Sequence, residues 1–364
     1  MVLRAAAGWL AARGRRIFHN GGSERELGTA FVPDLNDSAS RTGSGWFSVR
    51  VPEDFELADG GEYHEPVMAG EVSEWMRAGP GKRIVDGTLG GGGHSEAFLK
   101  AGAEVVGIDR DPEALTHARQ RLQRFGDRFQ AVESDFGDVE NVVGEKGADG
   151  LLLDLGVSSR QVDAPDRGFS FTHEGPLDMR MGPSVELTAA DVVNGFPEEE
   201  LARIFRELGE EKAARRIARA IVRRRSDRPF RTTTELASCV ETANKRRGRR
   251  HPATKTFQAI RMTVNDELGS LRRVLDSAAR VLRPGGRLLV ISFHSLEDRM
   301  VKRFLRESSA ETVDRPEWPA ARPNPKRAFR LLNRRGVTPT EEEIARNPRS
   351  RSARLRVGER IEEP

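Results

Sequence analysis

Short apolar runs alternate with amphipathic stretches between residues 83 and 154. The runs predict strands at 83–86, 104–109, 128–133 and 149–154, and the stretches between them predict helices at 95–101 and 112–125. Apolar strands that alternate with helices are typical of a parallel sheet covered on both faces. The alternation returns with a helix pattern at 263–282, a sharp Pro-Gly-Gly turn at 284–286 and a strand at 287–293. The pattern predicts an α/β fold, closed by a strand pair at 328–332 and 353–357.

The alternation stops between residues 163 and 257, where polar helical patterns dominate and no strand pattern stands out. Three acids after Pro197 suit the first turn of a helix, and 213–225 alternates arginine with apolar residues at helical spacing. We therefore expect an inserted helical domain at 163–257. It separates the first part of an α/β domain, 61–162, from a second part, 258–364, which has a basic C-terminal segment and an irregular stretch at 306–325.

Residues 1–60 are rich in Gly, Ser, Asn and Asp and lack sustained periodicity, so they predict a disordered N-terminal extension. The first 20 residues are Arg-rich and free of acids, as in an organelle transit peptide, but they lack the apolar stretch of a secretory signal. We favour a disordered extension or an overextended start site over a transit peptide.

Composition and charge limit the kinds of site and partner that the chain can have. Hydrophobic residues make up 37% of the chain and no run approaches the ~20 apolar residues of a membrane span. The net charge is only +4, yet 15 Lys and Arg face four acids between residues 211 and 257. This segment is either a solvated helix face or a site for a phosphate-rich partner. A single cysteine, Cys239, excludes an intrachain disulfide and a multi-thiolate zinc site, and favours the cytoplasm.

Four of the predicted strands end at or near an acid: Asp86, Asp109, Asp135 and Asp154. A glycine-rich turn at 87–94 follows the first strand, where glycine lets a ligand approach the backbone. Asp109, 23 residues after Asp86, is placed to accept the two hydroxyls of a ribose, which NAD and S-adenosylmethionine both carry. No Gly-Lys-Ser/Thr follows, which excludes a P-loop, and the dinucleotide glycine spacing is met only loosely. Each acid alone would also suit a solvated strand end.

Several motifs help to decide between NAD and S-adenosylmethionine as the cofactor. The Pro-Gly-Gly turn between a helix and a strand is familiar from class I methyltransferases. The other motifs lie at 86–88 (DGT), 91–95 (GGGHS), 152–159 (LLDLGVSS), 167–171 (RGFSF), 175–181 (GPLDMRM), 251–261 (HPATKTFQAIR), 264–268 (VNDEL), 291–299 (ISFHSLEDR) and 347–352 (NPRSRS). Together they resemble the bacterial 16S ribosomal RNA cytosine-N4 methyltransferase family, from about residue 63 to 360.

The resemblance implies a class I (Rossmann-like) S-adenosylmethionine-dependent methyltransferase fold with an inserted helical domain, and a set of cofactor contacts. Gly92, Gly93 and His94 would hold the methionine end, Asp109 the ribose and Phe136 the adenine, while Asp154 and Gln161 would lie beside the donor methyl. Phe136 would equally suit the core, and His94 a helix cap. Arg160 departs from relatives that have proline before the glutamine. Other amino-methyltransferases carry an Asp/Asn/Ser-Pro-Pro-aromatic motif after the fourth strand, and this chain lacks it. Asp154 facing the amine is therefore our own hypothesis for catalysis.

The implied partner is 16S ribosomal RNA or the small ribosomal subunit, with no membrane and no obligate protein partner. Phe169 and Phe171 would stack on a flipped cytosine or pack the insert against the main domain. The proposed phosphate contacts are Lys245, Arg246, Arg247, Arg249 and Arg250. We expect no metal, because His64, His94 and His294 lack i, i+4 spacing and methyl transfer needs none. The alternatives are a NAD-dependent oxidoreductase, a DNA amino-methyltransferase and a non-catalytic RNA-binding factor.

Overall fold

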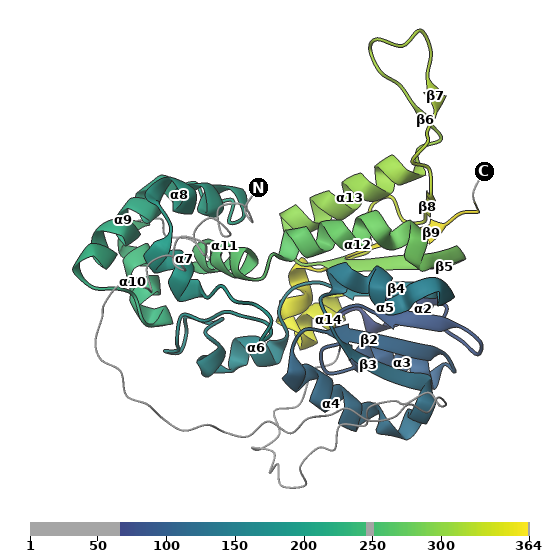
Figure 1. Ribbon diagram of the computed structural model, residues 1–364, viewed down its shortest axis with the longest axis horizontal. Helices are drawn as coiled ribbons and strands as arrows, with labels where there is room; N and C mark the ends of the chain where they lie inside the picture. The colour runs from purple at the N-terminus through teal and green to yellow at the C-terminus, as the bar shows by residue number, and fades with distance from the viewer. Residues whose placement is uncertain (1–65, 245–250, 363–364) are drawn as a thin grey trace, which may run out of the picture. The chain divides into compact units, whose positions relative to one another are not determined.

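A seven-stranded sheet in the order β3-β2-β1-β4-β5-β9-β8 forms the centre of the computed structural model, which describes residues 66–244 and 251–362 (Figure 1). The strands are β1 (Arg83–Asp86), β2 (Glu104–Asp109), β3 (Phe129–Glu133), β4 (Ala148–Asp154), β5 (Leu282–Ser292), β8 (Phe329–Leu331) and β9 (Arg354–Arg360). The first five run parallel, while β9 is antiparallel to β5 and to β8. The α/β fold and the closing strand pair are as predicted.

The buried strands alternate their apolar side chains between the two faces of the sheet, as the period of two requires. Val85, Leu151 and Leu153 pack in one cluster with residues of α5 (Val139–Val143), α12 (Glu267–Val281) and α13 (Ser295–Ser309). Ile84 and Leu152 point the other way, into a cluster with α2 (Ala69–Met76) and α3 (Gly93–Lys100). Both faces are therefore covered, which is why these strands read as continuous apolar runs.

The remaining helices are α4 (Pro112–Leu122), α6 (Ser159–Asp163), α7 (Ala189–Gly195), α8 (Glu198–Glu207), α9 (Ala214–Asp227), α10 (Thr233–Ala243), α11 (Thr254–Val264) and α14 (Glu341–Arg346). Short 3₁₀ helices lie at Gln123–Arg128, Phe136–Asp138, Gly144–Lys146, Pro165–Arg167 and Pro348–Ser352. A small two-stranded sheet pairs β6 (Thr312–Val313) with β7 (Arg322–Pro323). The long segment between β4 and β5 thus contributes α6 to α12, and its predicted boundaries at 163 and 257 remain expectations.

Three local predictions are corrected. The helix expected at 263–282 is two helices, because the chain breaks at Asn265 and at Asp266, whose φ is 48°. The turn expected at 284–286 lies within β5, where a register shift opposite Ala148 and Gly150 absorbs the irregularity. The stretch expected to be irregular from residue 306 is helical up to Ser309, because α13 buries Val301, Leu305 and Ser308.

No helix in the described parts of the chain has the length and apolarity that crossing a bilayer requires. The extension predicted at 1–60 lies outside the described residues.

Candidate active site

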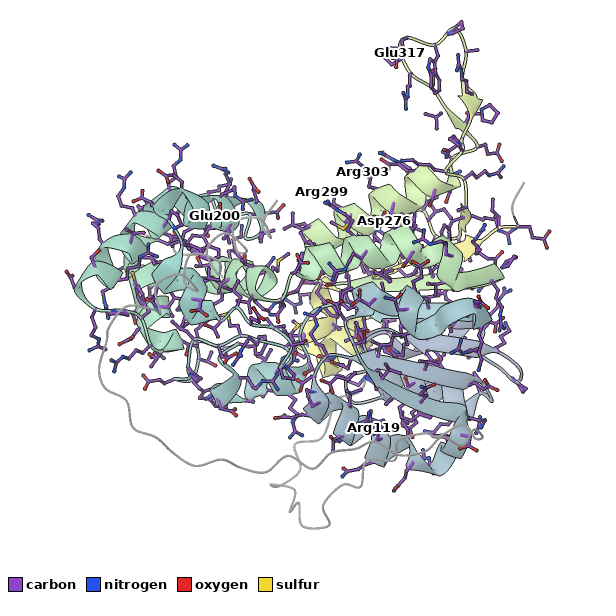
Figure 2. All side chains as sticks on the ribbon, viewed as in Figure 1. Arg119, Glu200, Asp276, Arg299, Arg303 and Glu317 are labelled. Carbon is purple, nitrogen blue, oxygen red and sulfur yellow. The ribbon has the colours of Figure 1, made fainter. Side chains whose placement is uncertain are left out.

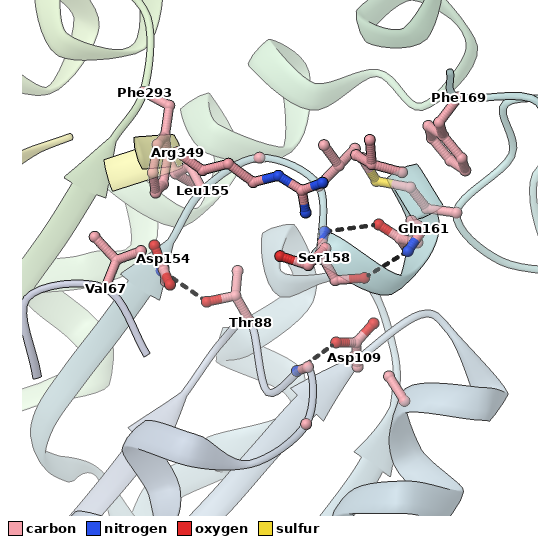
Figure 3. Close-up of a pocket in the computed structure, with 18 of the residues that line it drawn as sticks. Val67, Thr88, Asp109, Asp154, Leu155, Ser158, Gln161, Phe169, Phe293 and Arg349 are labelled. Carbon is pink, nitrogen blue, oxygen red and sulfur yellow. Dashed lines mark hydrogen bonds between the residues drawn. The ribbon is translucent and has the colours of Figure 1, made fainter. Parts of the chain in front are cut away.

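A pocket of about 560 Å³ opens at the carboxyl edge of β1, β2 and β4 (Figure 3). Strand order reverses between β1 and β4, and this is the point at which open α/β sheets leave a crevice for a ligand. One wall comes from the turn after β1 and from the ends of β2 and β4. The other wall comes from the segments after β4, from α11, and from the C-terminal Asn347 and Arg349.

The glycine-rich turn follows β1 directly and fixes both the pocket floor and the start of α3. Gly90 has a φ of +49° and donates its backbone N–H to Asp109 Oδ2 at 2.8 Å. Gly92, at φ +77°, is the N-cap of α3, and a Cβ there would lie 2.9 Å from Leu122 Cδ1. Gly93 and His94 line the pocket, whereas Gly92 lies behind its wall and sets the turn.

Asp109 ends β2 at the pocket floor. Its Oδ1 accepts the backbone N–H of Asp111 at 3.0 Å, so each carboxylate oxygen holds one backbone hydrogen bond and keeps capacity for another. Burial raises the pKa of Asp109 to about 6, although the two N–H donors oppose the shift. The arrangement suits a carboxylate that completes its hydrogen bonds with a ligand.

Three ionisable side chains, Asp86, His94 and Asp154, interact near the ends of β1 and β4, and His94 and Asp154 line the pocket. Asp86 is buried and accepts the Ser95 hydroxyl at 2.7 Å, and burial raises its pKa. His94 Nε2 lies 3.7 Å from Asp154 Oδ2. Among the described residues, neither His94 Nε2 nor Asp154 Oδ1 has a hydrogen-bond partner, although both atoms are buried. Buried polar atoms in a pocket that lack protein partners are available to hydrogen-bond a ligand.

Gln161 lines the pocket from α6, and its side chain already has protein partners. Its Oε1 accepts the N–H of Ser158 in a capping box (Figure 3). Its Nε2 donates to Asp111 Oδ2 at 3.1 Å. Arg167 donates to the same Asp111 oxygen at 3.0 Å. Arg160 is exposed and lies 3.6 Å from Glu113, which is also 3.7 Å from Arg167. Gln161 therefore orders the loop after β4 as well as lining the pocket.

The aromatic residues predicted to meet ligands all line the pocket, but their surroundings differ. Phe136 also packs against the main core cluster. Phe169 is buried at the pocket wall (Figure 3). Phe171 stacks on His251 with ring centroids 4.6 Å apart and meets the edge of Phe257 at 5.0 Å. Phe171 is therefore held within an aromatic cluster of the insert, which favours packing over base stacking for this residue.

The proposed phosphate contacts Lys245, Arg246, Arg247, Arg249 and Arg250 lie outside the described residues. They directly precede His251, which contacts the aromatic cluster at the pocket edge. Their role stays a prediction.

Sequence reasoning missed several pocket residues that come from distant segments. Arg261 makes a bidentate pair with Glu267, with both bonds at 2.8 Å, and Arg349 pairs with Asp163 at 2.7 Å. Phe293 and His294 also line the pocket. Each of these residues lies in a motif noted above, and the motifs could have identified them as candidates. The sequence does not, however, predict that they lie beside the strand ends.

Glu267, His294 and Glu297 bring their ligand atoms within 4.8 Å of one another, a spacing that a metal ion could use. Both carboxylates have protein partners, because Glu267 pairs with Arg261 and Glu297 accepts the N–H of Phe293 at 3.0 Å. A cation would compete with a guanidinium there, and the prediction of no metal stays a prediction.

A parallel sheet in the order 3-2-1-4-5, a glycine-rich turn after its central strand and acids at its carboxyl edge define a Rossmann-like protein that binds a nucleoside-bearing cofactor. The model of the MraW methylase family matches residues 61–361. The chain belongs to this family and is a methyltransferase.

Its relatives match over nearly their whole length. A ribosomal RNA small subunit methyltransferase H from Carboxydothermus hydrogenoformans is 50% identical over 304 residues, which cover 82% of this chain and 98% of that protein. The protein of the same name from Anaeromyxobacter sp. (strain K) is 51% identical over 304 residues, with the same coverage. Another, from Geobacter sulfurreducens, is 49% identical over 307 residues, covering 82% of this chain and 99% of that protein.

Proposed function

We propose that this enzyme transfers a methyl group from S-adenosylmethionine to the exocyclic N4 amine of a specific cytidine in 16S ribosomal RNA. The observation that carries the proposal is a single pocket with two unlike walls. One wall presents strand-end acids and a glycine-rich turn, and the other presents aromatic rings and side-chain amide and guanidinium groups. The first suits an adenosyl cofactor and the second suits an unstacked nucleobase. The relatives are named as small-subunit ribosomal RNA methyltransferases.

The residues present fit this cofactor. Asp109 has one free acceptor position on each oxygen for a ribose diol, and Phe136 offers a ring on the same side of the pocket. Gly93 and His94 would lie along the methionine end, with Asp154 and Gln161 near the methyl. Among the described pocket residues, His94 Nε2, Asp154 Oδ1 and His294 Nε2 are buried atoms without a hydrogen-bond partner that a ligand would satisfy.

Bound S-adenosylmethionine supplies a sulfonium methyl that already has a good leaving group. The protein therefore contributes mainly orientation and electrostatics. The amine of cytosine is a weak nucleophile, because its lone pair is delocalised into the ring. Asp154 Oδ1 is a free acceptor at the pocket base, so it would accept a hydrogen bond from the amine and localise that pair. Its backbone N–H donates to Thr88 Oγ1 at 2.7 Å, which fixes its position relative to the turn (Figure 3).

Besides the nucleobase in the pocket, the RNA backbone would be bound by a basic segment of the insert. The 211–257 segment is dense in Lys and Arg, which favours phosphate contacts, and the proposed partner is free 16S ribosomal RNA or the assembled small subunit in the cytoplasm. A DNA amino-methyltransferase would share the chemistry and should label naked DNA. A NAD-dependent oxidoreductase or a non-catalytic binding factor would share the fold and should show no methyl transfer.

The test is mass spectrometry of ribosomal RNA nucleosides from cells with and without the gene. We expect N4-methylated cytidine to disappear from the small-subunit RNA and to return when the gene is restored on a plasmid. A plasmid carrying Asp109→Ala is the matched control and should fail to restore it. An unchanged nucleoside profile in the deletion strain would refute the proposed substrate.

A further inference from the structure

A narrow arm, residues 310–327, follows α13 and extends beyond the end of that helix (Figure 1). Its base is the β6–β7 pair, in which Thr312 faces Pro323. Towards its tip, Trp318 carries two guanidinium groups on its ring, with Arg315 at 4.9 Å and Arg322 at 4.7 Å from the centroid. Most residues of the arm are exposed, while Trp318 is half-buried and Asn324 at its base is buried. The cation–π contacts therefore hold two cations in place on a projecting element.

α13 connects this arm to the pocket. The helix is capped by His294, which lines the pocket, and its 15 residues span on the order of 22 Å before the arm begins. Its exposed side carries Arg299, Lys302, Arg303 and Arg306, whose spacing of three or four residues places them on one face. Figure 2 draws Arg299 and Arg303 along this face and Glu317 at the arm. We call this face and the arm together the basic track.

Not all of these cations are neutralised. Arg299 pairs with Glu210, Arg303 with Glu307, and Arg327 with Glu311. In the described parts of the chain, Lys302, Arg306, Arg315 and Arg322 have no carboxylate within ion-pair distance, and on the arm only Asp314 and Glu317 are acids that remain without a cation. Between residues 299 and 327 there are eight Lys and Arg against four acids.

We propose that the basic track binds backbone phosphates of the ribosomal RNA that flank the target nucleotide, at a site separate from the 245–250 loop. An arginine stacked on an aromatic ring keeps its edge N–H groups free for phosphate oxygens and has less side-chain entropy to lose on binding. The cations begin on α13, whose cap residue His294 lines the pocket, and continue on the arm that follows the helix, so an RNA strand leaving the pocket along α13 would meet them in turn. This inference rests on the proposed function, because it takes the substrate to be a large RNA.

The test uses the full chain with Arg306→Ala, Arg315→Ala and Arg322→Ala combined. The matched control removes three exposed cations from other faces, Lys100→Ala, Arg119→Ala and Lys146→Ala. Affinity is measured by filter binding over a range of salt concentrations. One RNA is a 16S fragment that extends at least one helical turn beyond the target, and the other is a short oligonucleotide that carries the target cytidine.

We expect the track variant to bind the long fragment about tenfold more weakly, with the slope of log K against log salt smaller in magnitude by about two. Binding of the short oligonucleotide and of S-adenosylmethionine should be unchanged, as should all three affinities in the control. A second variant, in which residues 314–321 are replaced by Asn-Gly so that a two-residue turn joins the paired Val313 and Arg322, should also lose affinity for the long fragment only.

An unchanged salt slope, or an equal loss on the short oligonucleotide, would overturn the proposal. Full affinity for the naked fragment with weaker binding to intact small subunits would also overturn it and indicate a protein contact instead. The proposed function fails separately, when the wild-type chain methylates neither RNA, whatever the track variant binds.

Discussion

Two carboxylates at the pocket floor differ in what surrounds them, and this difference assigns them different tasks. Asp109 has a backbone N–H on each oxygen and is held rigidly by the turn and by β2. Asp154 has one oxygen near His94 and the other without a partner in the described residues. A rigid acceptor pair suits binding, and an unsatisfied acceptor suits an interaction that forms only with substrate.

Asp109 should make cofactor binding depend on pH. A ribose diol donates to the carboxylate, and the pKa of Asp109 is about 6 in the ligand-free chain. Affinity for S-adenosylmethionine should therefore be flat above about pH 7 and fall towards tenfold per unit below pH 6. Calorimetric titration between pH 5 and 8 measures this.

Asp109→Asn provides the control. It should bind about 10- to 100-fold more weakly at pH 7.5, from the loss of two charge-assisted hydrogen bonds, and its remaining affinity should no longer change near pH 6. The same shift affects stability. The pKa of Asp109 is raised from 3.8 to about 6 in the folded state, so neutral Asp109 stabilises the cofactor-free chain below pH 3.8. This stabilisation is lost as the pH rises through about 6. A variant with the wild-type pH profile would exclude Asp109 as the ribose acceptor.

Asp154 should act on turnover more than on cofactor binding. In Asp154→Ala the acceptor for the amine is gone, and we expect kcat to fall about 100-fold or more, while the cofactor dissociation constant changes less than about threefold. Single-turnover transfer of labelled methyl to 16S RNA measures the loss of rate, and calorimetry measures the cofactor dissociation constant. Thr88→Val loses the hydroxyl that holds the Asp154 backbone and should give a smaller loss of rate. Full-rate methylation by Asp154→Ala would eliminate the hypothesis.

At the scale of elements, the junction between α11 and α12 joins the inserted segment to the sheet domain. Asn265, buried at this break, donates to the Met179 carbonyl at 2.8 Å and accepts the Met181 N–H at 2.8 Å. Its own carbonyl accepts from Arg110, which follows β2. The helix break therefore provides the cross-connection that anchors residues 179–181 beside the pocket.

Asn265→Ala should destabilise the protein by about 2–4 kcal/mol, because a buried N–H and a buried carbonyl lose their partners. Urea unfolding followed by fluorescence measures the free energy. Ser277→Ala on the next helix is the matched control. Its buried hydroxyl bonds only the carbonyl of Val274 in its own helix, so the cost should stay below about 1 kcal/mol. Equal losses of unfolding free energy in the two variants would mean that the hydrogen bonds of Asn265 at the junction do not stabilise the protein more than a bond within one helix does.

At the scale of the whole molecule, the pocket is assembled from segments that are far apart in the chain. The strand-end wall comes from residues 87–154, and the opposing wall includes residues 254–261, 293–294 and 347–349. The insert separates these segments in the sequence and itself lines the pocket with Phe169, Phe171 and Phe257, while its part from 211 to 257 carries 15 Lys and Arg against four acids. We therefore predict that substitutions in the basic part of the insert, away from the pocket lining, weaken RNA binding and leave cofactor binding intact.

Reversal of Lys245, Arg246, Arg247, Arg249 and Arg250 to glutamate tests this separation. Affinity for 16S ribosomal RNA should fall by more than about 100-fold at 0.1 M salt and the salt slope should decrease, because phosphate contacts become repulsive. Affinity for S-adenosylmethionine should stay within about twofold of wild type. Filter binding measures the affinity for RNA, and calorimetry measures the affinity for S-adenosylmethionine. An unchanged RNA affinity would refute the role of this loop.

The sequence alone was sufficient to predict which segments form the first four strands and which functional residues follow each strand. Apolar runs that end in acids, with glycines after the first, locate the cofactor wall because strand ends and tight turns are local features that neighbouring residues determine. Asp109 and Asp154 were found in this way. The Asn265 break and the strand through 284–286 were not, because a buried side chain and a neighbouring strand decide them.

Tertiary structure alone decided what faces these strand ends. Arg261, Phe293 and Arg349 reach the pocket only because β5 pairs with β4 and β9 with β5, which carries their segments to one edge of the sheet. It also decided that Gly92 lies behind the wall and that Phe171 is held by His251 and Phe257. Contacts between distant residues depend on the packing of the whole sheet, and no local pattern encodes that packing.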